Sequence, residues 1–396
     1  MKPGRQNAVR FIVLLGITSL FADITYEGAR SITGPFLSVL GASAAVVGLV
    51  AGLGEFVGYA LRLVSGYLSD RIGRHWLFTF LGYAAILAIP ALAIVGRWEV
   101  ACLLIIIERS GKAIRTPARD AMLSHATKEM GRGKGFGLHE ALDQIGAVAG
   151  PLMIAAILYL KKGYRLSFAV LFIPALLALL TLLIARIKFP VPRALETTFE
   201  EAPKDKSKKK LPRIFWVYTL FTIASVAGYA HFQLISFHFK SRAIVSDAFI
   251  PLLFALAMGV DGLVALIIGR IYDRIGLISL ISVPILTLPI PLLVFSHGYL
   301  GIISGIILWG MVMGVQETIM RAAIADMTPI EVRGTAYGIF NTAYGLAWFA
   351  GTSLMGVLYG ISIRYIFIFT LIAELVAAVF LFLSLYKPKD KREGIA

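Results

Sequence analysis

Ionisable side chains interrupt several long apolar stretches of this sequence. Asp23, Glu27 and Arg30 follow one another at i, i+4 and i+7, a spacing that places all three on one face of a helix. A charge at membrane depth is costly, so it usually faces the protein interior and serves an ion or substrate pathway. Acids placed in this way could carry protons, and bases could bind an anionic substrate. The candidates for these roles are Asp23, Glu27, Arg30, Glu55, Glu108, Arg109, Lys112, Arg115, Glu140, Asp143, His231, Asp261, Glu317 and Arg321.

The apolar stretch that begins near residue 99 carries a basic face. Its helical spacing aligns Glu108, Lys112, Arg115 and Arg119. Such a face could clamp an organic anion. Ion pairing within one helix is the alternative explanation for many of these charges. The pairs with suitable spacing are Glu27 with Arg30, Glu108 with Lys112, and Glu317 with Arg321.

Other kinds of chemistry find no support in the sequence. His231, next to Gln233 in an apolar stretch, is more typical of a hydrogen-bonded interior residue than of a metal ligand. There is one cysteine, Cys102, and no Cys/His cluster for a metal. A Gly-rich phosphate loop and a serine nucleophile elbow are also missing. We therefore expect neither an enzyme nor a cofactor or metal, and we expect proton chemistry mainly in the N-terminal half, where most of the ionisable candidates lie.

The composition places these charges in a membrane protein. Of the 396 residues 58% are hydrophobic and 15% charged, and the mean hydropathy is +0.81. Soluble domains carry about a quarter charged residues, so most of this chain requires lipid as its solvent. The net charge of +15 indicates basic cytoplasmic loops rather than binding to nucleic acid, which we do not expect.

Apolar stretches predict an all-α membrane protein with about twelve transmembrane helices in two pseudo-symmetric six-helix bundles. The first set covers residues 10–37, 45–66, 76–96, 99–122, 134–160 and 165–187. The second covers 213–240, 247–270, 277–296, 299–325, 333–360 and 364–386. Residues 1–187 would form the N-terminal bundle, 188–212 a linker, and 213–396 the C-terminal bundle with a short tail. We expect the protein to lie in the cell membrane, that is, the inner or plasma membrane. Basic residues around Lys206 and Lys389 place the linker and both termini on its cytoplasmic side.

The two halves repeat one another. Gly66-x-x-x-Asp70-Arg71-Ile72-Gly73 recurs as Gly269-x-x-x-Asp273-Arg274-Ile275-Gly276, at an offset of 269 − 66 = 203. The same offset matches Tyr26 with Tyr229. Duplication of this kind favours two bundles that rock about a central binding site.

The first of these repeats, continued by Arg74, resembles the signature of the major facilitator superfamily between its second and third helices. Glycines permit a tight turn there, and Arg71 and Arg74 would stay in the headgroup layer. The resemblance implies that Asp70 accepts hydrogen bonds from the facing half and gates access to the site. A basic loop that only sets topology is the alternative.

A second pattern, Gly137-x8-Gly146-x3-Gly150-Pro151, is similar to the antiporter motif of that superfamily. Bare glycine faces permit close helix packing, and proline kinks the helix. The closing glycine pair of the motif is replaced by Ile154-Ala155, and the family's Arg and Gln-Gly motif of the fourth helix is not matched. The resemblance implies an outward-pumping, proton-exchanging cycle.

We therefore expect a proton-coupled exporter of a small organic molecule that works as a monomer by alternating access. One alternative is a transporter of an organic anion or siderophore-like compound. Another is a non-transporting sensor or a membrane-embedded enzyme. Asp23, two turns from Arg30, is the first candidate for the proton carrier, because Arg30 would hold Glu27 ionised. Glu55 and then Asp143 come next.

Overall fold

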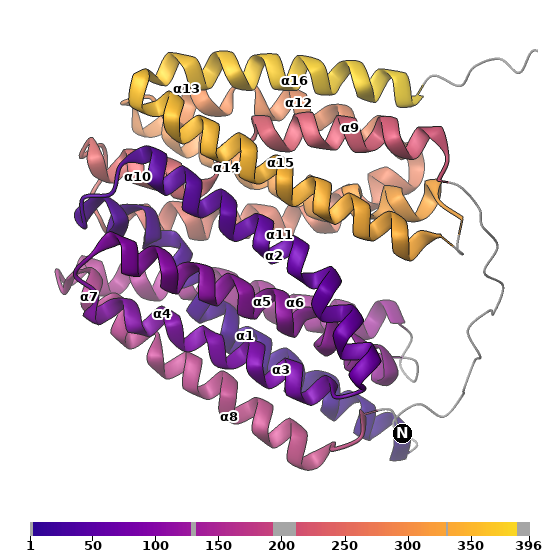
Figure 1. The fold of residues 1–396 in the computed structure, drawn as a ribbon. Coiled ribbons are helices and arrows are strands. Elements are labelled where there is room, and N and C mark those ends of the chain that lie inside the picture. The colour runs from indigo at the N-terminus through magenta and orange to yellow at the C-terminus, as the bar shows by residue number, and fades with distance from the viewer. Residues whose placement is uncertain (1–2, 128–131, 193–210, 330–331, 386–396) are drawn as a thin grey trace, which may run out of the picture.

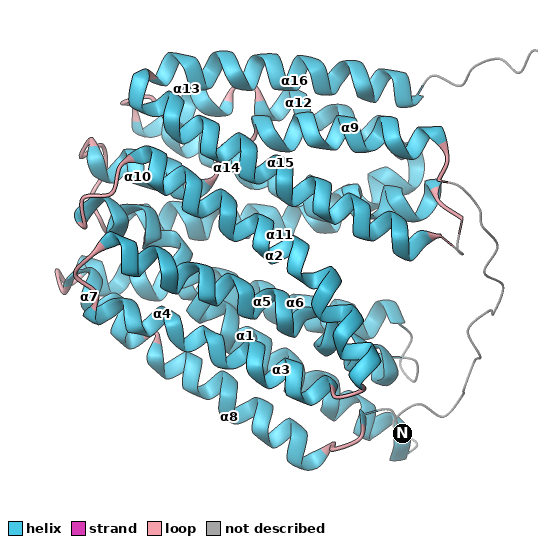
Figure 2. Ribbon diagram, viewed as in Figure 1, coloured by secondary structure: helices cyan, strands magenta, loops and turns pink. Residues whose placement is uncertain are grey.

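The computed structural model describes residues 3–127, 132–192, 211–329 and 332–385. A few side chains within these ranges, including those of Arg132 and Arg321, are not described. The linker around Lys206 and the tail around Lys389 lie outside the described residues. In the described part the chain is helical and contains no strand (Figure 2).

The helices of the N-terminal half coincide with the expected apolar stretches. They are α1 (Pro3–Val39), α2 (Ala44–Ile72), α3 (His75–Ala84), η1 (Ala85–Leu87), α4 (Ala88–Ala91), η2 (Leu92–Ile94), α5 (Trp98–Thr127), α6 (Arg132–Tyr159), α7 (Gly163–Val170) and α8 (Phe172–Lys188). The stretch from α3 to η2 is broken into short pieces around Pro90, which lacks the N–H that a continuous helix would use.

The C-terminal half continues with α9 (Arg213–Gly228), α10 (Phe232–Ser241), α11 (Phe249–Ile275), η4 (Gly276–Ile281), α12 (Ser282–Thr287), α13 (Ile290–Val294), α14 (Tyr299–Met327), α15 (Arg333–Ile361) and α16 (Ile363–Leu385). Prolines again mark the short pieces, at Pro284, Pro289 and Pro291. Ten helical segments of the described chain, one of them Phe249–Val294, are long and apolar enough to cross a membrane.

The helices run roughly alongside one another between two sides of the molecule (Figure 1). The N-terminus and the ends that flank the linker lie on one side, which we call the linker side. The loops before α2 and after α10 lie on the opposite side, which we call the far side. Helices α1, α2, α5 and α6 pack on one another, as do α9, α11, α14, α15 and α16. The two halves of the chain meet where α2 packs on α15, α6 on α11, and α1 on α10.

The sequence repeat corresponds to a structural one. Gly73 ends α2 with φ 69° and Gly276 ends α11 with φ 61°. Both values lie in the region that L-residues with a side chain rarely adopt, which explains why the repeated motif has glycine at this position.

The two halves approach closely near the far side. A side chain added at Gly48 of α2 would collide with the backbone of Thr352 on α15. One added at Gly34 of α1 would collide with the Gln233 carbonyl and the Ser236 hydroxyl on α10. Glycine at these positions therefore permits direct contact between helix backbones of opposite halves and closes the far side.

Candidate functional site

A polar cavity of about 280 Å³ lies between the two halves. Helices α1, α2, α5 and α6 line it from one half, and α11, α14 and α15 from the other. The predicted candidates that line it are Asp23, Glu27, Arg30, Glu55, Arg109, Lys112, Arg115, Glu140, Asp143, Asp261 and Glu317. Most of the ionisable residues that interrupt the apolar stretches therefore face one common space.

Glu55 of α2 is the centre of the most buried group of charges. Its Oε1 lies 2.8 Å from Nη2 of Arg109 on α5 and 3.4 Å from Nη2 of Arg30 on α1. Glu55, Arg109 and Arg30 are each at most 6% exposed. Two guanidinium groups on one carboxylate stabilise its ionised form, so a buried charge here is compensated rather than isolated. Glu55 has no basic residue within a turn of its own helix, but neighbouring helices supply two.

His231 brings the C-terminal half to the same carboxylate. Its Nδ1 accepts a hydrogen bond from the backbone N–H of Gln233 (3.2 Å), so the proton of the neutral ring is on Nε2. That Nε2–H lies 3.4 Å from Glu55 Oε1 and donates to it. His231 is fully buried and hydrogen-bonded, as the sequence predicted for an interior residue.

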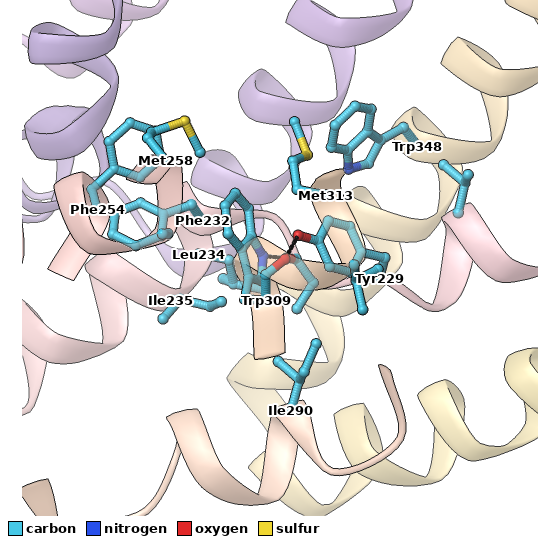
Figure 3. Close-up of a cluster of buried hydrophobic side chains, with 14 of the residues drawn as sticks. Tyr229, Phe232, Leu234, Ile235, Phe254, Met258, Ile290, Trp309, Met313 and Trp348 are labelled. Carbon is cyan, nitrogen blue, oxygen red and sulfur yellow. Dashed lines mark hydrogen bonds between the residues drawn. The ribbon is translucent and has the colours of Figure 1, made fainter. Parts of the chain in front are cut away.

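The break between α9 and α10 sets the position of His231. Tyr229 ends α9, and its hydroxyl donates to the Trp309 carbonyl (2.7 Å). The Trp309 indole N–H donates in return to the Ala230 carbonyl (2.8 Å). Figure 3 shows Tyr229 and Trp309 inside a cluster of buried side chains that includes Phe232 and Trp348. The indole satisfies a carbonyl that the interrupted helix leaves open, so His231 can begin a new helix with its ring directed at Glu55.

Aromatic rings support the basic face of α5. The Arg109 guanidinium carbon lies 4.5 Å from the centre of the Tyr26 ring, and Nζ of Lys112 lies 3.9 Å from it. The Arg115 guanidinium carbon lies 4.5 Å from the centre of the Tyr83 ring. These contacts hold three cations in place without neutralising them.

Of the three ionisable residues on α1, Glu27 and Arg30 form an ion pair, whereas Asp23 forms none with a described residue. Nη1 of Arg30 lies 3.6 Å from Oε2 of Glu27, which is the expected pair within one turn. Asp23 lines the cavity and forms no ion pair with a described residue. The expected pair of Glu108 with Lys112 is not formed in the described structure, because Lys112 turns to Tyr26. The pair of Glu317 with Arg321 involves a side chain outside the described part.

A second polar group lies nearer the linker side. Nη1 of Arg119 is 3.9 Å from Asp143 Oδ2 and 3.0 Å from the Ser19 hydroxyl. Nδ1 of His139 lies 3.5 Å from the same Asp143 oxygen. His139 was missed as a candidate, although its i, i+4 spacing to Asp143 was the available signal.

One amide, Gln144, links the two halves at the cavity, and two buried acids lie outside it. Gln144 of α6 donates to the Met258 carbonyl of α11 (2.5 Å) and also to Asp261, and so joins the two halves. Glu108 is buried outside the cavity, with one oxygen that has no hydrogen-bond partner in the described structure. Glu374 of α16, missed from the sequence, is buried against Ser225 of α9 (3.4 Å), away from the cavity. An isolated acid inside an apolar final helix was the available signal for it.

The repeated motifs occupy the ends of α2 and α11 at the linker side, away from the cavity. Asp70 and Asp273 are both exposed, and neither forms an ion pair with a described residue. Arg71 contacts the hydroxyl of Tyr67, one turn earlier (3.4 Å). Arg74, Gly269 and Arg274 also lie at this end, and a side chain added at Gly66 would touch Pro117 of α5 in the same half. In this conformation Asp70 therefore forms no ion pair with the described residues of the facing half.

The glycines of α6 divide into two groups. A side chain at Gly146 would collide with the Leu20 carbonyl, and one at Gly150 with the Ile24 carbonyl, so both glycines let α6 pack directly on α1. Gly137 has nothing within 4 Å of the position where a side chain would begin. Pro151 lies within α6, which continues through it.

The chain belongs to the Major Facilitator Superfamily. The model of that family matches residues 15–352 and, in a second overlapping match, 244–396. The fold, the cavity between two halves and this family assignment together define a multi-pass membrane protein that is a secondary transporter and not an enzyme.

The chain is also similar to other proteins over almost its whole length, and its fold matches that of a solved structure. The chain is 41% identical to an uncharacterized protein of Mycobacterium tuberculosis (strain ATCC 25618 / H37Rv), over 95% of this chain and 93% of the relative. It is 26% identical to an uncharacterized MFS-type transporter of Methanocaldococcus jannaschii, over 93% and 94%. The structure of the nucleoside transporter NupG has the same fold, with a TM-score of 0.74 at 15% identity, over 95% of this chain and 100% of that one.

Proposed function

We propose that this protein exports a small polar organic molecule in exchange for protons, by alternating access of the central cavity. The observation that carries the proposal is the placement of the charges. Carboxylates from both halves and bases from the N-terminal half line one cavity, and His231 of the C-terminal half bonds to Glu55 of the N-terminal half. Such a contact changes when the halves rock, so it can link occupancy of the site to the conformation of the protein.

Twelve transmembrane helices in two six-helix bundles are part of the proposal. The segment Phe249–Val294 has 46 residues, more than one crossing needs, and the positive φ of Gly276 turns the chain within it. Helix α5 is long enough to cross, and its charges explain why hydropathy alone passes over it. Adding α5 to the ten segments, and counting Phe249–Val294 as two crossings, gives six crossings in 1–187 and six in 213–396. The linker 188–212 joins the two sets.

The proposed orientation places both termini and the linker on the cytoplasmic side of the cell membrane, because basic residues concentrate on that side. The cavity then extends toward the cytoplasm along α5, from Arg109 to Asp120, whose side chain is 42% exposed. The far side, closed around Gly34 and Gly48, would face outward. The structure would thus correspond to an inward-facing state of a monomer.

Asp23 is the proposed proton carrier. It lines the cavity without an ion pair to a described residue, whereas Glu27 is held by Arg30 and Glu55 by two guanidinium groups. A carrier must gain and lose a proton in each cycle, and a strongly paired carboxylate does not do so readily. Asp143, with Arg119 and His139 as neighbours, is the second candidate.

Two observations support export. One is the antiporter-like glycines of α6, and the other is the similarity of about half of the chain to a multidrug resistance protein. The chain is 25% identical to the multidrug resistance protein MdtG of Proteus mirabilis over 46% of each chain. An organic anion is the second candidate substrate, because Lys112 and Arg115 line the cavity on aromatic supports.

The proposal is tested by reconstitution. Compounds that raise the thermal stability of the purified protein at two pH values would first be selected, and the exchange of each labelled compound across proteoliposomes then measured. We expect flux above that of protein-free liposomes without ATP. Tight binding without flux would contradict a transport function.

A further inference from the structure

The charges of the cavity do not all compensate one another. Arg109 and Arg30 share Glu55, Arg30 also contacts Glu27, and Arg119 contacts Asp120 and Asp143. Arg62 and Glu140 have contacts of their own. Once these pairs are set aside, Asp23 and two cations remain on the N-terminal half, whereas the C-terminal half contributes carboxylates alone among the described cavity residues.

The charges that remain on the N-terminal half include two cations of α5. Lys112 and Arg115 line the cavity and form no ion pair with a described residue. Arg115 is 2% exposed, and its Nε and Nη1 have no hydrogen-bond partner in the described structure. A buried guanidinium with open N–H groups beside a polar cavity is a ready site for an anionic group, because leaving such donors unpaired is costly.

The charges that remain on the C-terminal half are carboxylates. Asp261 of α11 and Glu317 of α14 line the same cavity, and Asp261 is 6% exposed. Their mutual repulsion disfavours two negative charges in one place, and a cationic group between them would relieve it. Among the described cavity residues contributed by α11, α14 and α15, none is basic.

We propose that the substrate is a small zwitterion that bridges the two halves. Its anionic group, a carboxylate or phosphate, binds Lys112 and Arg115, and its ammonium group binds Asp261 and Glu317. The inference rests on the proposed transport function and names its substrate class. A ligand that binds oppositely charged poles on two moving halves stabilises the closed state more than either open state, which is what coupling of transport to binding requires.

Equilibrium binding to the purified full chain tests this inference separately from transport. The probes are unbranched ω-amino acids of two to six carbons, each with the carboxylate and the amine of the same length. We expect at least one ω-amino acid to bind at least about tenfold more tightly than both of its singly charged counterparts, as expected for one charge-assisted hydrogen bond.

Two substitutions assign the poles. Glu317→Gln should make the amino acid bind no better than the matched carboxylate, and Lys112→Gln no better than the matched amine. Lys188→Gln and Glu99→Gln, which change exposed charges outside the cavity, should leave the preference intact. Lys112 is the chosen cation because it is less buried than Arg115, so its substitution should disturb the fold less.

The remaining outcomes overturn the inference. Equal binding of an amine or a carboxylate alone would define a singly charged substrate, and the absence of binding by every ω-amino acid and by their aminoalkyl phosphate counterparts would overturn the inference. Bipolar binding without flux in proteoliposomes would instead keep the ligand class and contradict transport.

Discussion

Nε2 of His231 donates a hydrogen bond to Oε1 of Glu55 over 3.4 Å, and these residues belong to opposite halves of the molecule. The two residues are 176 positions apart in the sequence. The contact is buried, and the same carboxylate oxygen also forms an ion pair with Nη2 of Arg109. The state that is closed on the far side thus depends on a polar contact whose partners must separate if the halves rock apart there.

Replacing His231 tests this dependence. His231→Leu removes the donor and leaves Glu55 with its arginine partners, so the closed far side should lose stability relative to the open one. Spin labels at Lys162 and Arg242, both exposed near the far side, would report the change on a Cys102→Ala background. We expect longer distances in the variant and intermediate behaviour in His231→Gln. An unchanged distribution in His231→Leu would show that the contact does not hold the halves together.

The ion pair of Glu55 with Arg109 should make a large contribution to stability. Removing one partner of a buried pair leaves an uncompensated charge, which destabilises a protein by about 3–5 kcal/mol. Glu55→Gln and Arg109→Gln should each lower the thermal stability strongly, and the double variant should lose less than the sum of both. Additive losses in this double-mutant cycle would mean that the pair is not coupled.

The glycines of α6 provide a matched comparison. Gly150→Val places a side chain against the Ile24 carbonyl of α1 and should reduce the yield of folded protein, whereas Gly137→Val meets open space and should be tolerated. Size-exclusion profiles of both variants in detergent measure this difference. Equal behaviour would remove the packing argument for the antiporter-like motif.

Asp70→Asn tests the proposed gate. Asp70 is exposed here, so the variant should fold and insert normally. If the carboxylate binds the facing half when the linker side closes, exchange should slow several-fold, and Asp273→Asn, at the repeated position, serves as the comparison. Unchanged exchange in Asp70→Asn would make the charged end of α2 a determinant of topology alone.

The sequence predicted the helical segments closely, because long apolar stretches and their breaks depend on local composition. It also predicted the pair of Glu27 with Arg30, since three residues along a helix fix that distance. It did not predict the partners of Glu55, because Arg109, Arg30 and His231 come from three other helices. Nor did it predict that Lys112 would turn to Tyr26 instead of Glu108, since Tyr26 lies on α1 and only the packing of α1 against α5 brings it to Lys112. Tertiary packing alone decides such choices.

The central claim is that proton movement drives export, with Asp23 as the carrier. Its most direct test is the accumulation of a bound compound in proteoliposomes under an imposed pH gradient, compared between the wild type and Asp23→Asn. The amide cannot carry a proton, so the variant should still exchange the compound but no longer accumulate it, while Glu27→Gln should mainly weaken binding. Full gradient-driven accumulation in both variants would contradict the account and move the proton site to Asp143 or Glu55.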